Sequence, residues 1–203
     1  MTDPPGEGPA PEPVDQPVEA SRSSTRRLVE WCLVIGGALL VAYLIQLTSL
    51  QAFSIPSESM LPTLHKGDRV LVNKWSYRLH DVHRGDVVVF TRPPAVTDTT
   101  IDDLIKRVVG LPGDEVTITG GHVEIDGHAL DEPYLPPHMR TDDVGPIGCP
   151  VDHPCVIPDD QIWVMGDNRI NSEDSRWFGP IPESTVVGRA AVRIWPLDRI
   201  DGL

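Results

Sequence analysis

The feature of the sequence that most constrains the fold is an apolar segment near the N-terminus, from Trp31 to Leu47. It carries no charged residue and continues with weakly polar residues as far as Phe53. A segment of this length that is apolar all round predicts one membrane-spanning helix, which we place at residues 28–50. A buried helix of a soluble protein fits less well, because such a helix is apolar mainly on one face.

A cleaved secretory signal peptide is an alternative, since it also combines arginines with an apolar stretch near the N-terminus. Two features favour an uncleaved anchor. The apolar run is longer than the usual hydrophobic region of a signal peptide, and Leu50 stands where a cut after Ala52 would require a small residue. We therefore expect the segment to remain in the protein as an anchor.

The residues before the anchor predict its orientation. The first twenty residues contain six prolines and five acidic residues, a composition that buries too little apolar surface to offset the entropy of ordering. We expect residues 1–27 to form a disordered tail. Arginines precede the span at Arg22, Arg26 and Arg27, whereas residues 48–57 contain no Lys or Arg. The positive-inside rule therefore predicts a cytoplasmic tail and an extracytoplasmic domain formed by residues 51–203.

The outer segment, residues 51–203, is long enough for one compact core. Its apolar runs are short, rich in β-branched residues and separated by turn residues: 69–73, 86–91, 105–111, 115–119, 122–125, 161–165 and 186–195. Gly120-Gly121 and Asp126-Gly127 are typical of two-residue hairpin turns. The sequence thus predicts a mainly β domain. Residues 131–160, rich in Pro, Gly and Asp, are expected to form a loop-rich excursion from it.

The charge balance limits the partners of the protein. Only 17 Lys and Arg stand against 30 Asp and Glu, so the formal net charge is −13. This excludes nucleic-acid binding through a broad basic surface. Any docking of the outer domain on a lipid bilayer must accordingly be hydrophobic rather than electrostatic.

The three cysteines have separate interpretations. Cys32 lies in the predicted span and serves as a small apolar residue. Cys149 and Cys155 lie six positions apart in the excursion, on the side assigned to the oxidising compartment. A disulfide that closes a small loop is favoured there over two free thiols. His153 between them, without a second ligand cluster, does not have the spacing of a zinc site, so we expect no metal.

Two segments carry candidate chemistry. Ser57 and Ser59 are expected on one side of an extended chain limited by Pro56 and Pro62, although a serine pair alone indicates little. Lys106 begins an otherwise apolar run, where lost hydration would lower its pKa and leave a neutral amine able to take a proton from a serine hydroxyl. A third, polar cluster at residues 166–179 is either a solvated turn or a structured loop that positions its neighbours.

With these segments, the sequence strongly resembles the bacterial type I signal peptidases, also called leader peptidases, which are membrane-anchored serine peptidases with a Ser–Lys dyad. Four signature segments occur in order behind a single span: Ser57-Glu-Ser-Met-Leu-Pro-Thr63, Gly67-Asp-Arg-Val-Leu-Val-Asn-Lys74, Lys106-Arg-Val-Val-Gly-Leu-Pro-Gly-Asp114 and Gly166-Asp-Asn-Arg-Ile-Asn-Ser-Glu-Asp-Ser-Arg176. A lysine at the base position argues against the eukaryotic and archaeal branch, which uses histidine.

The resemblance implies a role for each matching residue. Ser59 would be the nucleophile and Lys106 the general base, with the Ser57 hydroxyl and the Ser59 backbone N–H as the oxyanion hole. Ser172 would orient the lysine amine through a hydrogen bond. Support near the site would come from an ion pair of two further residues, Asp174 and Arg176.

The chain departs from the family pattern at two positions. Some members have an aromatic residue where this chain has Leu104, and many have Asp where it has Ile170. Both departures are compatible with the same chemistry, although Leu104 changes what packs near the lysine.

The resemblance also implies an activity, namely cleavage of signal peptides from exported preproteins after small residues. The enzyme would act as a monomer at the bacterial cell membrane and without a cofactor. Two alternatives remain open at this stage. One is a narrow-client Ser–Lys peptidase that processes pilins or conjugation proteins, and the other is an anchored binding module, which would need neither Ser59 nor Lys106.

The predicted orientation has a direct test. Protease added to the outer face of intact cells or spheroplasts should leave residues 1–27 undigested, while a reporter fused after Leu203 should behave as exported. Lysed cells, in which the tail becomes digestible, are the control. A tail that is digested from outside would reverse the orientation.

Overall fold

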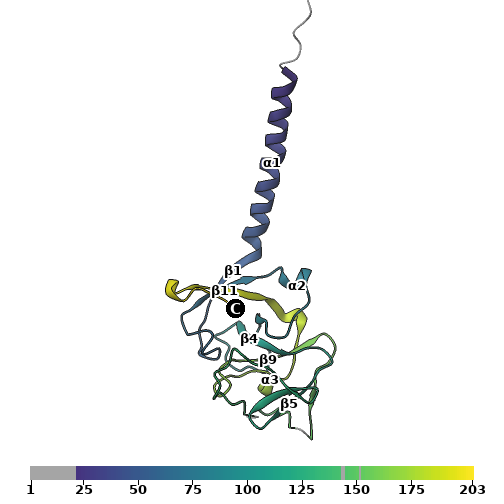
Figure 1. The fold of residues 1–203 in the computed structure, drawn as a ribbon, viewed down its shortest axis with the longest axis vertical. Helices are drawn as coiled ribbons and strands as arrows, with labels where there is room; N and C mark the ends of the chain where they lie inside the picture. Colours follow the sequence, from purple (N-terminus) through teal and green to yellow (C-terminus); the bar gives the residue numbers. More distant parts are fainter. Residues whose placement is uncertain (1–21, 143–144, 151) are drawn as a thin grey trace, which may run out of the picture. The chain divides into compact units, whose positions relative to one another are not determined.

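The computed structural model describes residues 22–142, 145–150 and 152–203, and it divides into two compact units that meet between Gln46 and Leu47. Most of the expected tail, residues 1–21, lies outside the described residues. One continuous helix, α1 (Arg22–Ser49), makes up the described part of the first unit and extends three residues into the second; it is drawn in purple to blue in Figure 1. By length and composition, its stretch from Arg26 to Leu44 is a candidate membrane span.

The bounds of α1 differ from the prediction at both ends. Residues 22–27 were expected in the disordered tail, but they are helical. Extending an existing helix adds one backbone hydrogen bond for each residue fixed, and Arg26 pairs with Glu30 one turn later at 3.4 Å. At the other end, Leu50 belongs to the first strand rather than to the anchor.

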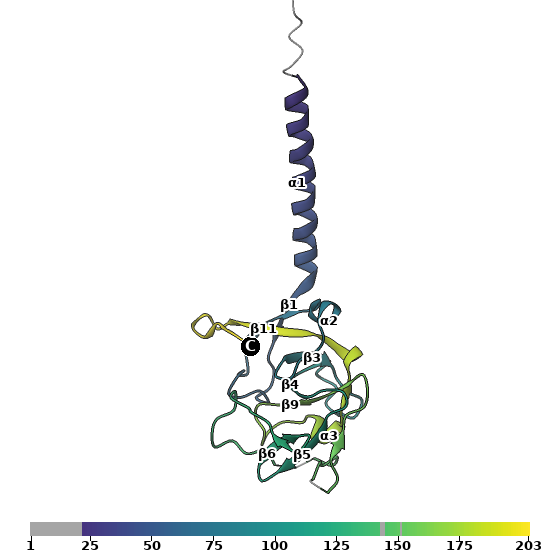
Figure 2. The same ribbon diagram turned by 45° about the vertical axis from the view of Figure 1, so that its right-hand side comes forward.

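The second unit is built on a curled antiparallel sheet, as the sequence predicted. The strand order is β1 (Leu50–Ser54), β2 (Arg69–Asn73), β11 (Val186–Trp195), β3 (Val87–Thr91), β4 (Asp103–Gly110), β9 (Gln161–Met165) and β10 (Ile181–Pro182), with β12 (Asp201–Gly202) paired to β11. Register shifts interrupt β11 and β4. Such bulges increase the local twist and so help to curl the sheet. Figure 2 shows β11, β3, β4 and β9 following one another across the unit.

A smaller antiparallel sheet covers the β9 side of this unit (Figures 1 and 2). Its order is β7 (His128–Ala129), β6 (His122–Ile125), β5 (Glu115–Thr119) and β8 (Cys155–Val156). Both hairpin predictions are confirmed. Gly120 and Gly121 have φ of 59° and 87°, and Asp126 and Gly127 have φ of 52° and 74°. Positive φ at both central residues is the requirement of a type I′ turn, which matches the twist of the flanking strands.

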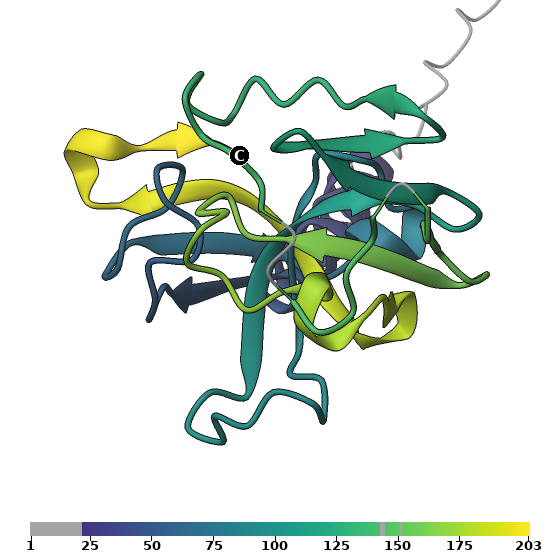
Figure 3. The same cartoon turned by 90° about the horizontal axis from the view of Figure 1, so that it is seen from below.

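The remaining elements are short: α2 (Ser76–Leu79), α3 (Ser175–Phe178), η1 (Glu183–Thr185) and η2 (Leu197–Arg199). Figure 3 shows two extensions from the body of the second unit. One is the yellow hairpin made by the end of β11, η2 and β12, and the other is the teal connection between β3 and β4.

The packing of the core explains why the strand sequences are continuous runs of β-branched residues. On β3, Val87 and Val89 pack into one buried cluster, whereas Val88 and Phe90 pack into another. Both faces of this strand are therefore covered, and its five residues need not alternate with polar ones. On β9, Trp163 packs with the small sheet, while its neighbours Ile162 and Val164 pack on the other side.

The excursion at residues 131–160 is mainly turns, as expected, but it also supplies β8 to the small sheet. Cys149 and Cys155 form a disulfide with a Cα–Cα distance of 5.2 Å. Cys149 is fully buried in the core of the small sheet. The disulfide therefore closes a small loop, as expected, and Cys149 fixes one end of this loop in the core.

Candidate active site

Ser59 lies in the connection between β1 and β2, which two backbone hydrogen bonds close at its base. The Ile55 N–H donates to the Asp68 carbonyl at 2.9 Å, and the Gly67 N–H donates to the Ile55 carbonyl at 2.9 Å. Met60, next to Ser59, has no exposed surface and packs in the main core. The residue beside the serine is therefore a buried anchor, which limits how far the hydroxyl can move.

The expectation of an extended chain at Ser57 and Ser59 is wrong. The segment bends and turns, with the Leu61 N–H donating to the Glu58 carbonyl at 3.1 Å and the Leu64 N–H to the Met60 carbonyl at 2.8 Å. Burial of the apolar residues that follow Ser59 favours the turn over an extended strand. The two hydroxyls still meet, with 3.2 Å between their Oγ atoms.

Lys106 comes from the middle of β4, where it pairs in register with Val88 of β3. Its Nζ donates a hydrogen bond to Ser59 Oγ at 2.6 Å. Lys106 is 3% exposed and Ser59 is 8% exposed. Residues 47 positions apart in the chain are thus brought together in a site that is nearly closed to water.

Burial lowers the pKa of the Lys106 amine from its ordinary value of 10.5 to about 8, because desolvation disfavours the charged form. Neighbouring charges modify this shift. Three carboxylates raise the pKa and one guanidinium lowers it; in order of effect these are Asp174, Asp167, Glu173 and Arg176. About a tenth of this lysine is therefore neutral at pH 7, far more than of a lysine in water.

Two hollows adjoin the serine and lysine, and Ser57, Ile101, Leu104 and Lys106 line both. The first, of about 390 Å³, is otherwise lined by Phe53, Ser54, Ile55, Pro56, Val89, Asp103 and Ile105. The second, of about 610 Å³, is otherwise lined by Glu58, Ser59, Val96, Asp98, Asn171 and Glu173. An extended segment could thus lie beside the hydroxyl with its side chains entering a largely apolar hollow.

The polar cluster after β9 is a structured loop that holds the serine segment. The Asn168 backbone N–H donates to the Ser59 carbonyl at 3.0 Å, and its side-chain amide donates to the Glu58 carbonyl at 3.1 Å. Next to it, Asp167 accepts two hydrogen bonds from Arg107, at 2.8 and 2.7 Å. Because Arg107 follows Lys106 in β4, this loop contacts both segments that supply the candidate dyad.

Asp174 and Arg176 form the expected ion pair, with both side chains fully buried. Arg176 donates to the two carboxylate oxygens at 2.9 and 2.8 Å. Asp174 also accepts the Gly166 N–H at 3.1 Å and caps the N-terminus of α3. The pair thus fixes the two ends of the polar loop to each other.

Ser172 does not make the hydrogen bond expected of it. Its Oγ is buried without a hydrogen-bond partner among the residues that the structure describes. The hydroxyl lies so close to Gly166 that a side-chain carbon there would overlap it, and the Ser59 carbonyl lies against the same glycine. Ser172 therefore packs beside the backbone of the serine segment instead of bonding the lysine amine.

Sequence reasoning missed the roles of Asp167, Asn168 and Arg107, although all three lie in the signature segments. Each of these charged or amide residues lies in or just after an apolar run, and this was a usable signal. Such a group requires a hydrogen-bond or ion-pair partner if it is buried. As for metals, among residues 22–142, 145–150 and 152–203, no group of three or more His, Cys, Asp or Glu side chains could hold an ion.

Comparisons with known proteins identify the class of this fold and site as serine peptidases, which are hydrolases. The family model described as "Signal peptidase, peptidase S26" matches residues 28–195. The chain belongs to this family.

The similar proteins include two signal peptidases that align over most of their length. Signal peptidase I of Leptolyngbya laminosa is 38% identical over 203 residues, covering 97% of this chain and 95% of that protein. Signal peptidase IB of Staphylococcus aureus is 36% identical over 180 residues, covering 84% and 91%. A crystal structure of a signal peptidase I from Enterococcus faecalis V583 aligns with 25% identity and a TM-score of 0.44, covering 55% of this chain and 98% of that one.

The lowered pKa of Lys106 predicts a distinctive titration. The amine should lose its proton at about pH 8 rather than at 10.5, because the charged form is desolvated. The chemical shift of the lysine Cε carbon, followed against pH by NMR, measures this. The signal should vanish in Lys106→Ala. The prediction fails if the signal that is missing from Lys106→Ala titrates at 10.5 in the unchanged protein, because the amine is then not desolvated.

Proposed function

We propose that this signal peptidase cleaves exported preproteins with Ser59 as nucleophile and Lys106 as general base. The observation that carries the proposal is the 2.6 Å hydrogen bond between Lys106 Nζ and Ser59 Oγ. Burial lowers the pKa of the lysine to about 8, so the neutral amine can accept the serine proton. A nucleophile within hydrogen-bond distance of such a base meets the requirement for covalent catalysis.

In the acylation step, Ser59 Oγ attacks the carbonyl carbon of the residue before the cut, and Lys106 Nζ takes the hydroxyl proton. When the C–N bond breaks, the lysine returns this proton to the leaving amine, which becomes the N-terminus of the mature protein. The signal peptide remains as an ester on Ser59. Lys106 then takes a proton from a water molecule, whose oxygen attacks the ester, and finally protonates the departing serine oxygen.

Negative charge develops on the carbonyl oxygen during both attacks. We assign its stabilisation to the Ser57 hydroxyl and the Ser59 backbone N–H. The short distance between the two serine hydroxyls, 3.2 Å, supports the first assignment. The two hydrogen bonds from Asn168 to the Glu58 and Ser59 carbonyls support the second, because they limit rotation of the segment that carries the N–H.

The substrate in this proposal is an extended peptide that adds to a strand edge at the site. The end of β1 and the start of β4 both line the smaller hollow. We assign small apolar side chains at the first and third positions before the cut to this hollow, because its walls are mainly apolar. In the cell the catalytic unit would lie outside the bacterial membrane, anchored by α1, where the signal peptide is also held in the bilayer.

Removal of either dyad residue should abolish cleavage and leave the fold intact. Ser59→Ala and Lys106→Ala each eliminate one half of a unit that acts together. The measurement is processing of a panel of exported precursors, including pilin-like ones, with circular dichroism as the check on folding. Ser184→Ala and Lys66→Ala change the same residue types at exposed positions and should keep full activity. Turnover above trace levels in either dyad variant would refute the assignment.

Ser57→Ala should behave differently from Ser59→Ala. It keeps the dyad but removes one oxyanion donor, so kcat should fall about a hundredfold to a thousandfold. KM should barely change, because the lost hydrogen bond forms mainly in the transition state. Steady-state kinetics on one peptide substrate separate the two constants. If a covalent serine-directed inhibitor labels Ser57 instead of Ser59, the two roles are reversed.

A further inference from the structure

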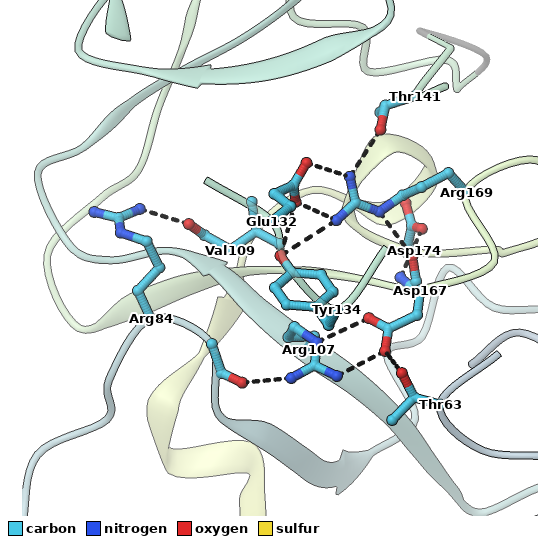
Figure 4. Close-up of polar contacts among 12 residues, drawn as sticks. Thr63, Arg84, Arg107, Val109, Glu132, Tyr134, Thr141, Asp167, Arg169 and Asp174 are labelled. Carbon is cyan, nitrogen blue, oxygen red and sulfur yellow. Dashed lines mark hydrogen bonds and ion pairs between the residues drawn. The ribbon is translucent and has the colours of Figure 1, made fainter. Parts of the chain in front are cut away.

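A third buried ion pair, between Arg169 and Glu132, has no part in the chemistry described above. Arg169 belongs to the polar loop and is fully buried, while Glu132 belongs to the excursion and its side chain is 10% exposed. The pair therefore joins the excursion to the loop that contacts the dyad segments. Figure 4 shows this cluster.

Every donor of the Arg169 guanidinium has an acceptor. Its Nε donates to the Gly166 carbonyl at 3.0 Å, and its terminal nitrogens donate to both carboxylate oxygens of Glu132, to Thr141 Oγ1 at 2.7 Å and to the Tyr134 hydroxyl at 3.5 Å. All the side-chain acceptors come from the excursion. A buried guanidinium that is fully satisfied in this way has a well-defined position.

Tyr134 links this arginine to a second one. Its ring lies against the Arg107 guanidinium, with 4.0 Å from the guanidinium carbon to the ring centroid. Its hydroxyl donates to Glu132 at 2.7 Å. In Figure 4 the tyrosine accordingly lies between the guanidinium groups of Arg107 and Arg169.

Both arginines are connected to the candidate dyad through neighbouring residues. Arg107 follows Lys106 and bonds Asp167, which also accepts a hydrogen bond from Thr63 at 2.5 Å. Arg169 bonds the carbonyl of Gly166, so it closes the turn that contains Asn168. That asparagine holds the Ser59 carbonyl.

From these contacts we infer that Glu132 and Tyr134 are positioning residues for the reaction. They hold the two arginines, and through them Asn168 against the serine segment and Arg107 beside Lys106. The 2.6 Å approach of Lys106 to Ser59 then depends on the excursion. The inference rests on the proposed roles of Ser59 and Lys106.

The test uses the full chain in detergent micelles, with three variants. Glu132→Gln keeps the shape of the side chain but leaves a buried guanidinium without its counter-charge. Tyr134→Phe keeps the ring on Arg107 and loses the hydroxyl. Asp131→Asn removes the charge of the neighbouring exposed residue and is the matched control. For each variant, kcat and KM are measured on one peptide substrate, and amide hydrogen exchange is followed at Asn168.

We expect Glu132→Gln to lower kcat roughly tenfold to a hundredfold with KM within about twofold, since small misplacements of reacting groups have effects of this size. The Asn168 amide should exchange faster, while the Arg92 amide, which bonds the Asp102 carbonyl outside the excursion, should keep its rate. Tyr134→Phe should shift the same two quantities in the same direction by a smaller factor. Asp131→Asn should match the unchanged protein.

Unchanged kcat, or unchanged exchange at Asn168, in Glu132→Gln would overturn the inference. So would an equal loss of kcat in Asp131→Asn. If Glu132→Gln does not fold, Tyr134→Phe decides by the same two readouts. The exchange measurement needs no substrate, so it distinguishes failure of this inference from failure of the proposed dyad.

Discussion

The structure of the site depends on keeping one lysine amine out of water beside a serine hydroxyl. A lysine in water is almost wholly charged at neutral pH and cannot accept a proton. In this protein the amine lies at the middle of a strand with 3% of the residue exposed, and desolvation brings its pKa to about 8. A buried strand position is what allows so strong a perturbation, because a surface lysine would simply extend into solvent.

Two buried arginines engage the carboxylates that work against this perturbation. The carboxylates of Asp167 and Asp174 lie close enough to raise the pKa of Lys106, which would oppose proton transfer from the serine. Each is engaged by a guanidinium, Asp167 by Arg107 and Asp174 by Arg176, with two hydrogen bonds in each case. These ion pairs give the buried carboxylates of the polar loop their hydrogen-bond partners. They also limit how much negative charge acts on the lysine amine.

Much of the fold could be predicted from the sequence because its signals are local. β2, β5, β6, β9 and β11 have the predicted bounds, since short β-branched runs between turn residues leave few alternatives. The turn at Ser59 was missed because Met60 and Leu64 are buried by tertiary packing, and no local pattern indicates which elements cover them. Asn168 was missed for a related reason. Its partners are backbone carbonyls more than a hundred residues earlier in the chain, and spacing within a motif carries no information about them.

Strand β4 belongs to both halves of the catalytic unit. It carries Lys106 in the main sheet, and a few residues later Val109 packs into the core of the small sheet. At the end of β4, a side-chain carbon on Gly110 would overlap the Ile157 side chain and press against Trp163 and Val116, so the strand packs closely on the core of the small sheet. Neither sheet can come apart without moving the strand that holds the lysine. The two sheets should therefore open as a single cooperative unit, so any condition that loosens the small sheet should also displace the strand that holds the buried lysine.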